Sequence, residues 1–294
     1  MKLTNKHNLP QPVYDAVSYS DYTGGKSDYS VSGLGEPAQK KWLTGVHRHE
    51  IEEDASDRLY ALMGSAMHSV LERADSTGIT EKRLQVTVDG LQISGQFDRL
   101  GLVSEDGGIT GVLQDYKLAS VWEYIYGLKP DKISQANCYV YLLRENGYKV
   151  DKAEIVMFFR DWMKSKAKFD KSYPPTQMGI INVPIWTQVE QYNYIAGRIA
   201  VHEDAKRTGT PAPCSDEERW YTGDKYAVMK GTNKKASKVE DTQEAAQKYL
   251  EGIKANPSAK DKDRYKIVHR PGVNKRCDDY CTASTFCEQY KGGE

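Results

Sequence analysis

Residues 91–119 read LQISGQFDRLGLVSEDGGITGVLQDYKLA and contain two strand-like runs separated by the turn sequence EDGG at 105–108. A third run, RLQVTVD, comes just before them, and Asp89-Gly90 lies between it and the next run. Asp-Gly flanked by alternating residues is a strong signal for a β-hairpin. The sequence therefore predicts an antiparallel meander of three strands.

Helices and further strands surround this meander. Helical spacing of apolar residues predicts helices over about 55–76, 132–146 and 187–207. EIVMFFRDW at 154–162 is rich in β-branched and aromatic residues and predicts a fourth strand, and IINVPIW at 180–186 predicts another. This order of elements predicts a sheet with helices packed on it, of mixed α/β or α+β type.

The chain is expected to fall into three regions. Residues 1–50 are expected to form an N-terminal arm, with loop over the first thirty residues, and an opening segment. Residues 51–210 form the core, and 211–294 form a C-terminal subdomain that carries cysteines. In that last region, KYAVMKGTNKKASKV predicts a hairpin and EDTQEAAQKYLEGIK predicts a helix with an acidic first turn.

Composition excludes several classes of protein. Hydrophobic residues make up 39% and charged residues 28% of the 294 residues, as in soluble globular proteins. No apolar run approaches the ~20 residues that span a bilayer, and the N-terminus has no apolar core of a signal peptide. A cytoplasmic protein is expected, in the host cytoplasm if a phage encodes it. The 41 basic and 41 acidic residues cancel, whereas nucleic-acid binders often have a basic excess.

Asp115 and Lys117 carry the first chemical signal. Side chains alternate along a strand, so Asp-x-Lys places a carboxylate beside an ammonium on one face. Asp98 ends the preceding strand and is expected to lie next to Asp115. Two convergent carboxylates suit Mg²⁺ or Mn²⁺, the ions used to cleave phosphodiesters, and a nearby lysine can orient the attacking water. Taken alone, Asp-x-Lys is too common to decide the function.

The helices on either side add further candidates. Gly64, His68 and Glu72 follow one another at intervals of four on the first helix, and the glycine suggests close packing there. His68 is expected to reach the two aspartates, although a lone histidine in apolar surroundings is more often a core residue. Glu81, just before the first strand, is either a further acidic partner or surface.

Gln135 and Tyr139 lie four residues apart on the helix that follows Asp-x-Lys. The glutamine could hydrogen-bond a phosphate or a base edge, and the tyrosine could stack on a base or contact the backbone. The alternative is a polar residue and a core aromatic on an ordinary helix.

Together these motifs resemble the RecB-type branch of the PD-(D/E)xK nuclease superfamily, which includes phage recombination exonucleases and CRISPR-associated single-strand exonucleases. The order and spacing match over about 55–160, and SVSGLGEPAQKKWL before it resembles the opening segment of such domains. The motifs that carry the resemblance are Gly64-x-x-x-His68-x-x-x-Glu72, Gly95-Gln96-Phe97-Asp98, Asp115-Tyr116-Lys117 and Gln135-x-x-x-Tyr139.

The resemblance implies a restriction-endonuclease-like core with a central mixed sheet flanked by helices. It implies that His68, Asp98 and Asp115 bind the metal, that Lys117 assists the attacking water, and that Gln135 and Tyr139 hold the substrate strand. It further implies an exonuclease that acts on single-stranded DNA or duplex ends in phage-type recombination, replication or repair, with a recombination or single-strand-binding protein as a partner. An endonuclease of the same fold and a silent DNA-binding module remain alternatives, and the oligomeric state is open.

Five cysteines in a chain without a signal peptide argue against a disulfide framework. Three lie at the C-terminus with the spacing Cys277-x₃-Cys281-x₅-Cys287, which suggests zinc or an iron–sulfur cluster. Several RecB-type nucleases join three such cysteines to an upstream one and hold a [4Fe–4S] cluster. This chain has Glu36-Pro37-Ala38 at that upstream place, so Cys214 is the expected fourth ligand, with an iron–sulfur cluster preferred to zinc. Cys138 is expected to be a small buried apolar residue.

Overall fold

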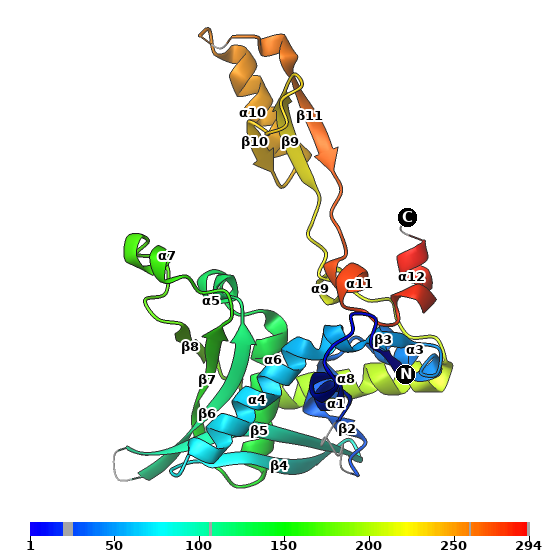
Figure 1. The fold of residues 1–294 in the computed structure, drawn as a ribbon, viewed down its shortest axis with the longest axis vertical. Helices are drawn as coiled ribbons and strands as arrows, with labels where there is room; N and C mark the ends of the chain where they lie inside the picture. The colour runs from blue at the N-terminus through cyan, green and yellow to red at the C-terminus, as the bar shows by residue number, and fades with distance from the viewer. Residues whose placement is uncertain (20–25, 106–107, 259, 293–294) are drawn as a thin grey trace. The chain divides into compact units, whose positions relative to one another are not determined.

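A computed structural model describes residues 1–19, 26–105, 108–258 and 260–292 of the chain (Figure 1). The chain divides into two units. The first consists of residues 1–42 and 48–212, and the second of residues 43–47 and 213–294. The predicted meander and the three predicted helices all lie in the first unit.

The first unit is built on a six-stranded mixed sheet with the order β2-β5-β6-β7-β8, and β4 pairs with β5 as well. The predicted meander is confirmed, because β4, β5 and β6 pair antiparallel in sequence order. β7 runs parallel to β6, and β8 returns antiparallel to β7. The strands are β2 (Tyr29–Ser30), β4 (Ile79–Val88), β5 (Leu91–Glu105), β6 (Gly108–Ala119), β7 (Val150–Phe159) and β8 (Met178–Val183).

The predicted Asp-Gly turn sets the register of the first hairpin. Val88 pairs with Leu91, and both turn residues have positive φ, 51° at Asp89 and 80° at Gly90. Two central residues in the left-handed region match the type I′ turn that favours tight hairpins. The second predicted turn includes residues 106–107, which lie outside the described residues.

All three predicted helices of the core are present, as α4 (Leu59–Ala74), α6 (Pro130–Glu145) and α8 (Gln188–Thr208). α4 is preceded by a 3₁₀ turn, η1 (Ala55–Arg58). α8 begins with a reciprocal capping box between Thr187 and Glu190. Within residues 51–210, the short helices α5 (Val121–Tyr126) after β6 and α7 (Lys164–Phe169) after β7 were not predicted.

The two helices nearest the sheet differ in burial. α6 lies in the core, and every residue from Ala136 to Leu143 is buried. α4 has no buried residue, and even its apolar residues Met63 and Val70, which fall at helical spacing, are exposed. The close packing expected at Gly64 is wrong, because a Cβ added there would meet nothing within 4 Å. Helical spacing identified α4 correctly but did not show how shallowly it packs.

The opening residues also differ from the expectation of a loop-rich arm. β1 (Lys2–Thr4) pairs with β3 (Glu52–Asp54), α1 (Gln11–Ser18) follows β1, and Tyr29 lies in β2. After β2 come α2 (Val31–Gly35) and α3 (Ala38–Val46).

Tyr29, Val31 and Leu34 are buried in the main core. The carbonyl of Leu34 accepts a hydrogen bond from Arg198 of α8. Within the first thirty residues, where loop was expected, the Tyr29 hydroxyl donates to Glu203 of α8, a partner far away in the sequence that local composition does not reveal.

The second unit contains a small antiparallel sheet with the order β10-β9-β11 and the helix α10. The predicted hairpin and helix are confirmed as β9 (Lys225–Lys230), β10 (Lys238–Glu240) and α10 (Gln243–Ala255), whereas β11 (Tyr265–Arg270) was not expected. Its small core consists of Val228, Ala246 and Leu250. The remaining elements are α9 (Asp216–Arg219), η2 (Lys262–Arg264), α11 (Lys275–Asp279), η3 (Ser284–Phe286) and α12 (Glu288–Lys291).

Among the helices of the described ranges, none has the length and apolar character needed to cross a membrane.

Candidate metal centre

The candidate site forms where β5 and β6 separate. Their pairing ends at Arg99 and Gln114, one residue before Asp98 and Asp115 would meet. Beyond this point the N–H of Tyr116 donates to a side chain instead of a backbone carbonyl: it donates to Oδ2 of Asp98 at 2.6 Å. Since Asp98 completes the hydrogen bonding of β6 at the fork, its position is set by the sheet itself.

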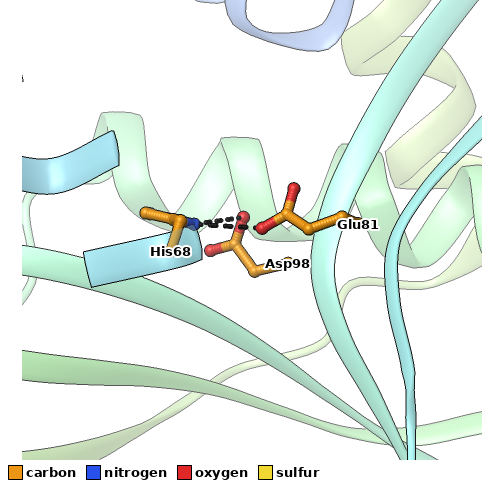
Figure 2. Close-up of side chains that lie close together, drawn as sticks. All are labelled: His68, Glu81 and Asp98. Carbon is orange, nitrogen blue, oxygen red and sulfur yellow. Dashed lines mark hydrogen bonds and ion pairs between the residues drawn. The ribbon is translucent and has the colours of Figure 1, made fainter. Parts of the chain in front are cut away.

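Three side chains converge at this fork, and Figure 2 shows them facing one another. Nδ1 of His68, on α4, lies 3.3 Å from Oε1 of Glu81 and 3.4 Å from Oδ1 of Asp98. One ligand atom from each residue lies within 4.8 Å of the other two. Two carboxylate oxygens and an imidazole nitrogen at this spacing fit a divalent cation such as Mg²⁺ or Mn²⁺.

Glu81 has an unusual backbone for a residue in a strand, with φ at 46°. Few residues other than glycine adopt the left-handed region, and those that do often belong to functional sites. The neighbouring pairs Thr80–Arg99 and Lys82–Phe97 place Glu81 opposite Asp98. The amide of Gln96, in the Gly-Gln-Phe-Asp motif, donates to Glu81 Oε2 at 2.8 Å and holds the carboxylate in place.

Asp115 and Lys117 lie beside this group, on β6. Lys117 Nζ is 3.0 Å from Oδ1 and 2.8 Å from Oδ2 of Asp115, which is only 3% exposed. Asp115 Oδ2 is buried and accepts no well-oriented hydrogen bond within the described chain. Its contact is the Lys117 ammonium, and a bound cation would supply a further one. We call His68, Glu81, Asp98, Asp115 and Lys117 the fork site.

The electrostatics of the fork site show crowded negative charge. Burial, together with the charge of Asp115, raises the pKa of Asp98 to about 7. The hydrogen bond to Glu81, followed by the charge of Asp98, raises the pKa of His68 despite its burial. Burial lowers the pKa of Lys117, but the charges of Asp115 and Asp98 outweigh it and leave the pKa above its usual value. A divalent cation would relieve the repulsion between the two aspartates.

The structure brings four of the predicted residues together, namely His68, Asp98, Asp115 and Lys117. Glu72 does not join them: it is exposed on α4, and the acidic partner of His68 is Glu81. A signal for Glu81 was present in the sequence. Counting outward from the Asp89-Gly90 turn places Glu81 opposite Asp98, because the hairpin keeps a constant register.

Gln135 and Tyr139 lie on the α6 side of the fork site. Burial, followed by the charges of Asp115 and Asp98, raises the pKa of Tyr139, while a hydrogen bond with Gln135 opposes this rise. Tyr139 is 9% exposed, so its ring has no open face on which a nucleobase could stack. Its ring packs against Gly95, where an added Cβ would lie 2.8 Å from Tyr139 Cε1.

The second unit contains the four cysteines predicted to bind a metal. Burial raises the pKa of the Cys214 thiol to about 12, and the neighbouring Glu218 and the thiols of Cys287, Cys277 and Cys281 add to the rise. We call Cys214, Cys277, Cys281 and Cys287 the cysteine cluster. Within the described chain, however, the group with three ligand atoms within 4.8 Å of one another is His68, Glu81 and Asp98, and no three of these cysteines meet that distance.

The backbone of Cys214 is fixed to the C-terminal tail. Its N–H donates to Gln289 Oε1 and its carbonyl accepts from Gln289 Nε2, both at 2.8 Å. This pair of bonds joins the segment after residue 212 to α12. Cys138 is buried in α6, as predicted, and lies in the first unit rather than in the cysteine cluster.

No protein family model and no curated protein matches the chain. Among solved structures, that of SSO0001 is similar at 14% sequence identity with a TM-score of 0.42, over 71% of this chain and 85% of that chain. An alkaline exonuclease (LHK-Exo) from Laribacter hongkongensis is similar at 13% identity with a TM-score of 0.36, over 61% of this chain and 92% of that one. Likenesses this distant do not decide the function.

Proposed function

We propose that the chain is a metal-dependent deoxyribonuclease that hydrolyses phosphodiester bonds at the fork site. The observation that supports this best is the convergence of His68, Glu81 and Asp98 beside the buried Asp115–Lys117 pair. Oxygen ligands and one imidazole around a carboxylate–lysine pair suit phosphodiester hydrolysis. The proposed substrate is DNA, as the motif resemblance implies.

Each residue of the fork site has a proposed role. His68, Glu81 and Asp98 hold Mg²⁺ or Mn²⁺, and Asp115 supplies a further carboxylate. The bound ion lowers the pKa of water and neutralises charge on the phosphate. Lys117, kept protonated by the two aspartates, orients the attacking water and stabilises negative charge on the phosphoryl oxygens. Gln135, which is only partly buried, is proposed to contact the substrate backbone.

Within this class we propose an exonuclease, following the motif resemblance. An endonuclease of the same fold would use the same residues. A silent module that only binds DNA is disfavoured, because Asp98, Asp115 and Lys117 are all present and converge.

Linear and covalently closed circular DNA of one sequence separate these alternatives when each is incubated with Mg²⁺. The exonuclease degrades the linear form and leaves the circle intact. Cleavage of both forms at one rate would show an endonuclease. Binding without cleavage, in Mg²⁺ and in Mn²⁺, would favour the silent module.

We further propose that Cys214, Cys277, Cys281 and Cys287 hold a metal group that fixes the C-terminal tail. Burial raises the pKa of the Cys214 and Cys277 thiols, and the other thiols add to the rise, so metal binding would relieve the cost of the thiolate form at these two residues. An iron–sulfur cluster is preferred to zinc, and its role is structural. Protein purified without air tests the choice: a brown colour with bound iron supports the cluster, and a colourless protein with zinc supports the alternative.

A further inference from the structure

Two short helices of the first unit carry exposed aromatic rings and lysines. Tyr126 on α5 and Phe169 on α7 are 82% and 88% exposed, and Trp122 on α5 is 42% exposed. Soluble proteins seldom leave neighbouring large apolar side chains in water, and such groups mark binding surfaces. We define the aromatic–lysine surface as Trp122, Tyr126, Lys164, Lys166, Lys168 and Phe169.

Ring contacts join the two helices into one surface. Trp122 stacks on Tyr126 with ring centroids 5.9 Å apart and packs edge-on against Tyr173 at 6.3 Å. Lys166 Nζ lies 4.8 Å from the centre of the Trp122 ring. Tyr173 is buried, and its hydroxyl accepts the N–H of Met163 at 3.0 Å. The Trp122 ring therefore packs against a buried tyrosine that is itself held by a hydrogen bond.

The charge of the surface is positive. Residues 160–173, RDWMKSKAKFDKSY, contain five basic and two acidic residues. Of the acidic ones, Asp161 accepts hydrogen bonds from the Ser120 hydroxyl and the Val121 N–H. In the described part of the chain, Lys164, Lys166 and Lys168 form no ion pair within 4.0 Å. The ammonium groups of Lys164 and Lys168 are therefore open to an anionic partner, whereas that of Lys166 lies over the Trp122 ring and is influenced by Asp170.

The surface also follows the ends of β6 and β7, and β6 carries two residues of the fork site. β6 carries Lys117 and ends at Ala119, and α5 follows directly. β7 is parallel to β6 and ends beside it, with the N–H of Arg160 donating to the carbonyl of Ala119 at 3.0 Å. Figure 1 shows α5 and α7 together beyond these strand ends. A nucleic-acid strand bound to this surface would lie next to the end of β6, two residues after Lys117.

We propose that the aromatic–lysine surface binds single-stranded nucleic acid, with bases stacked on its rings and phosphates at its lysines. Stacking on aromatic side chains needs unpaired bases, whose faces a duplex hides. Delivery of that strand to the fork site rests on the proposed nuclease function, whereas the binding itself does not. The surface would make an unpaired strand the substrate.

The test is binding by the full chain in EDTA, where metal-dependent cleavage is absent. Fluorescence anisotropy measures labelled oligo-dT and oligo-rU of about sixteen nucleotides, and a blunt duplex of equal length. The double variant Tyr126→Leu/Phe169→Leu keeps apolar side chains but removes two rings that are more than four-fifths exposed. The matched control, Tyr126→Trp/Phe169→Trp, keeps both rings.

The leucine variant is expected to bind oligo-dT at least about tenfold more weakly, while the tryptophan control binds as the wild type does. Duplex affinity should change less than about twofold. Unchanged oligo-dT binding by the leucine variant overturns the proposal, as does an equal loss for duplex. A loss for oligo-rU alone assigns the surface to RNA and overturns a role with the nuclease.

The lysines give a second measurement. Replacing Lys164, Lys166 and Lys168 by glutamine should flatten the salt dependence of oligo-dT binding, by about 0.7 in log–log slope for each phosphate that is no longer neutralised. An unchanged slope contradicts the proposal that these lysines contact the phosphates. If the wild-type chain cuts no DNA but both variant sets lose binding, the surface stands and the nuclease function falls.

Discussion

The fork site and the cysteine cluster are two candidate metal sites built in opposite ways. The fork site is held by a paired sheet and by fully buried side chains such as Leu100 and Leu113. The cysteine cluster belongs to short elements, of which α11 has five residues and α12 four. A sheet positions ligands before any metal binds, whereas short helices around thiols gain much of their stability from the metal. Loss of the metal should therefore abolish chemistry at the fork site without unfolding it, and should unfold the segment around the cysteine cluster.

Asp115→Asn should have the largest effect. It removes a charged ligand while keeping the size of the side chain, so DNA cleavage should fall at least about a hundredfold. Because the sheet holds the site, far-ultraviolet circular dichroism should not change. Full activity in this variant would remove Asp115 from the fork site, and loss of folding would show that the sheet does not hold the site without the Asp115–Lys117 pair.

The double variant Cys277→Ser/Cys287→Ser tests whether the segment around the cysteine cluster depends on its metal for folding. Without metal the C-terminal tail should unfold, so limited proteolysis with mass spectrometry should find new cuts within residues 271–292. Residues 48–212 should stay protected, since their core contains none of these cysteines. A tail as resistant as that of the wild type would show that apolar contacts alone hold it.

Glu81→Gln and Glu72→Gln form a matched pair, because the first changes the carboxylate that contacts His68 and the second an exposed carboxylate on the same helix as His68. Glu81→Gln should weaken Mn²⁺ binding, measured by calorimetry without DNA, by about tenfold, in the range typical for altering one group at a metal site. Glu72→Gln should leave it within about twofold of the wild type, because Glu72 is exposed on α4. Equal effects of the two variants would contradict the assignment of Glu81.

Two glycines give the smallest expected effects and have opposite signs. Gly95→Ala forces a methyl group against the Tyr139 ring and should lower the free energy of unfolding by about 1–3 kcal/mol. Gly64→Ala meets nothing within 4 Å in the middle of α4 and should raise it by roughly 0.5–1 kcal/mol. Urea unfolding measures both, and a destabilised Gly64→Ala would mean that α4 packs more closely than described.

Local patterns predicted much of the first unit. The Asp89-Gly90 turn and the helical spacing over 55–76 depend on neighbours in sequence, and both are present in the structure. The packing of Tyr29 and Leu34 depends on α8, more than 150 residues away, which no local pattern reveals. β11 was missed for a similar reason, because its strand forms by pairing with the earlier β9.

The candidate site was predicted in part. His68, Asp98, Asp115 and Lys117 were identified by spacing and meet at the fork. Glu72 was chosen over Glu81 because helical periodicity favoured it, while the hairpin register that brings Glu81 to Asp98 was not applied. The left-handed backbone of Glu81 has no signal in the sequence, since glutamate rarely adopts it.

The central claim is that the fork site cleaves DNA with a divalent cation. The most direct test is degradation of end-labelled single- and double-stranded DNA by the wild-type chain in Mg²⁺, in Mn²⁺ and in chelator. The account predicts loss of label in either metal, faster on the single strand, and none in chelator. Cleavage that persists in chelator, or none in either metal, would contradict it.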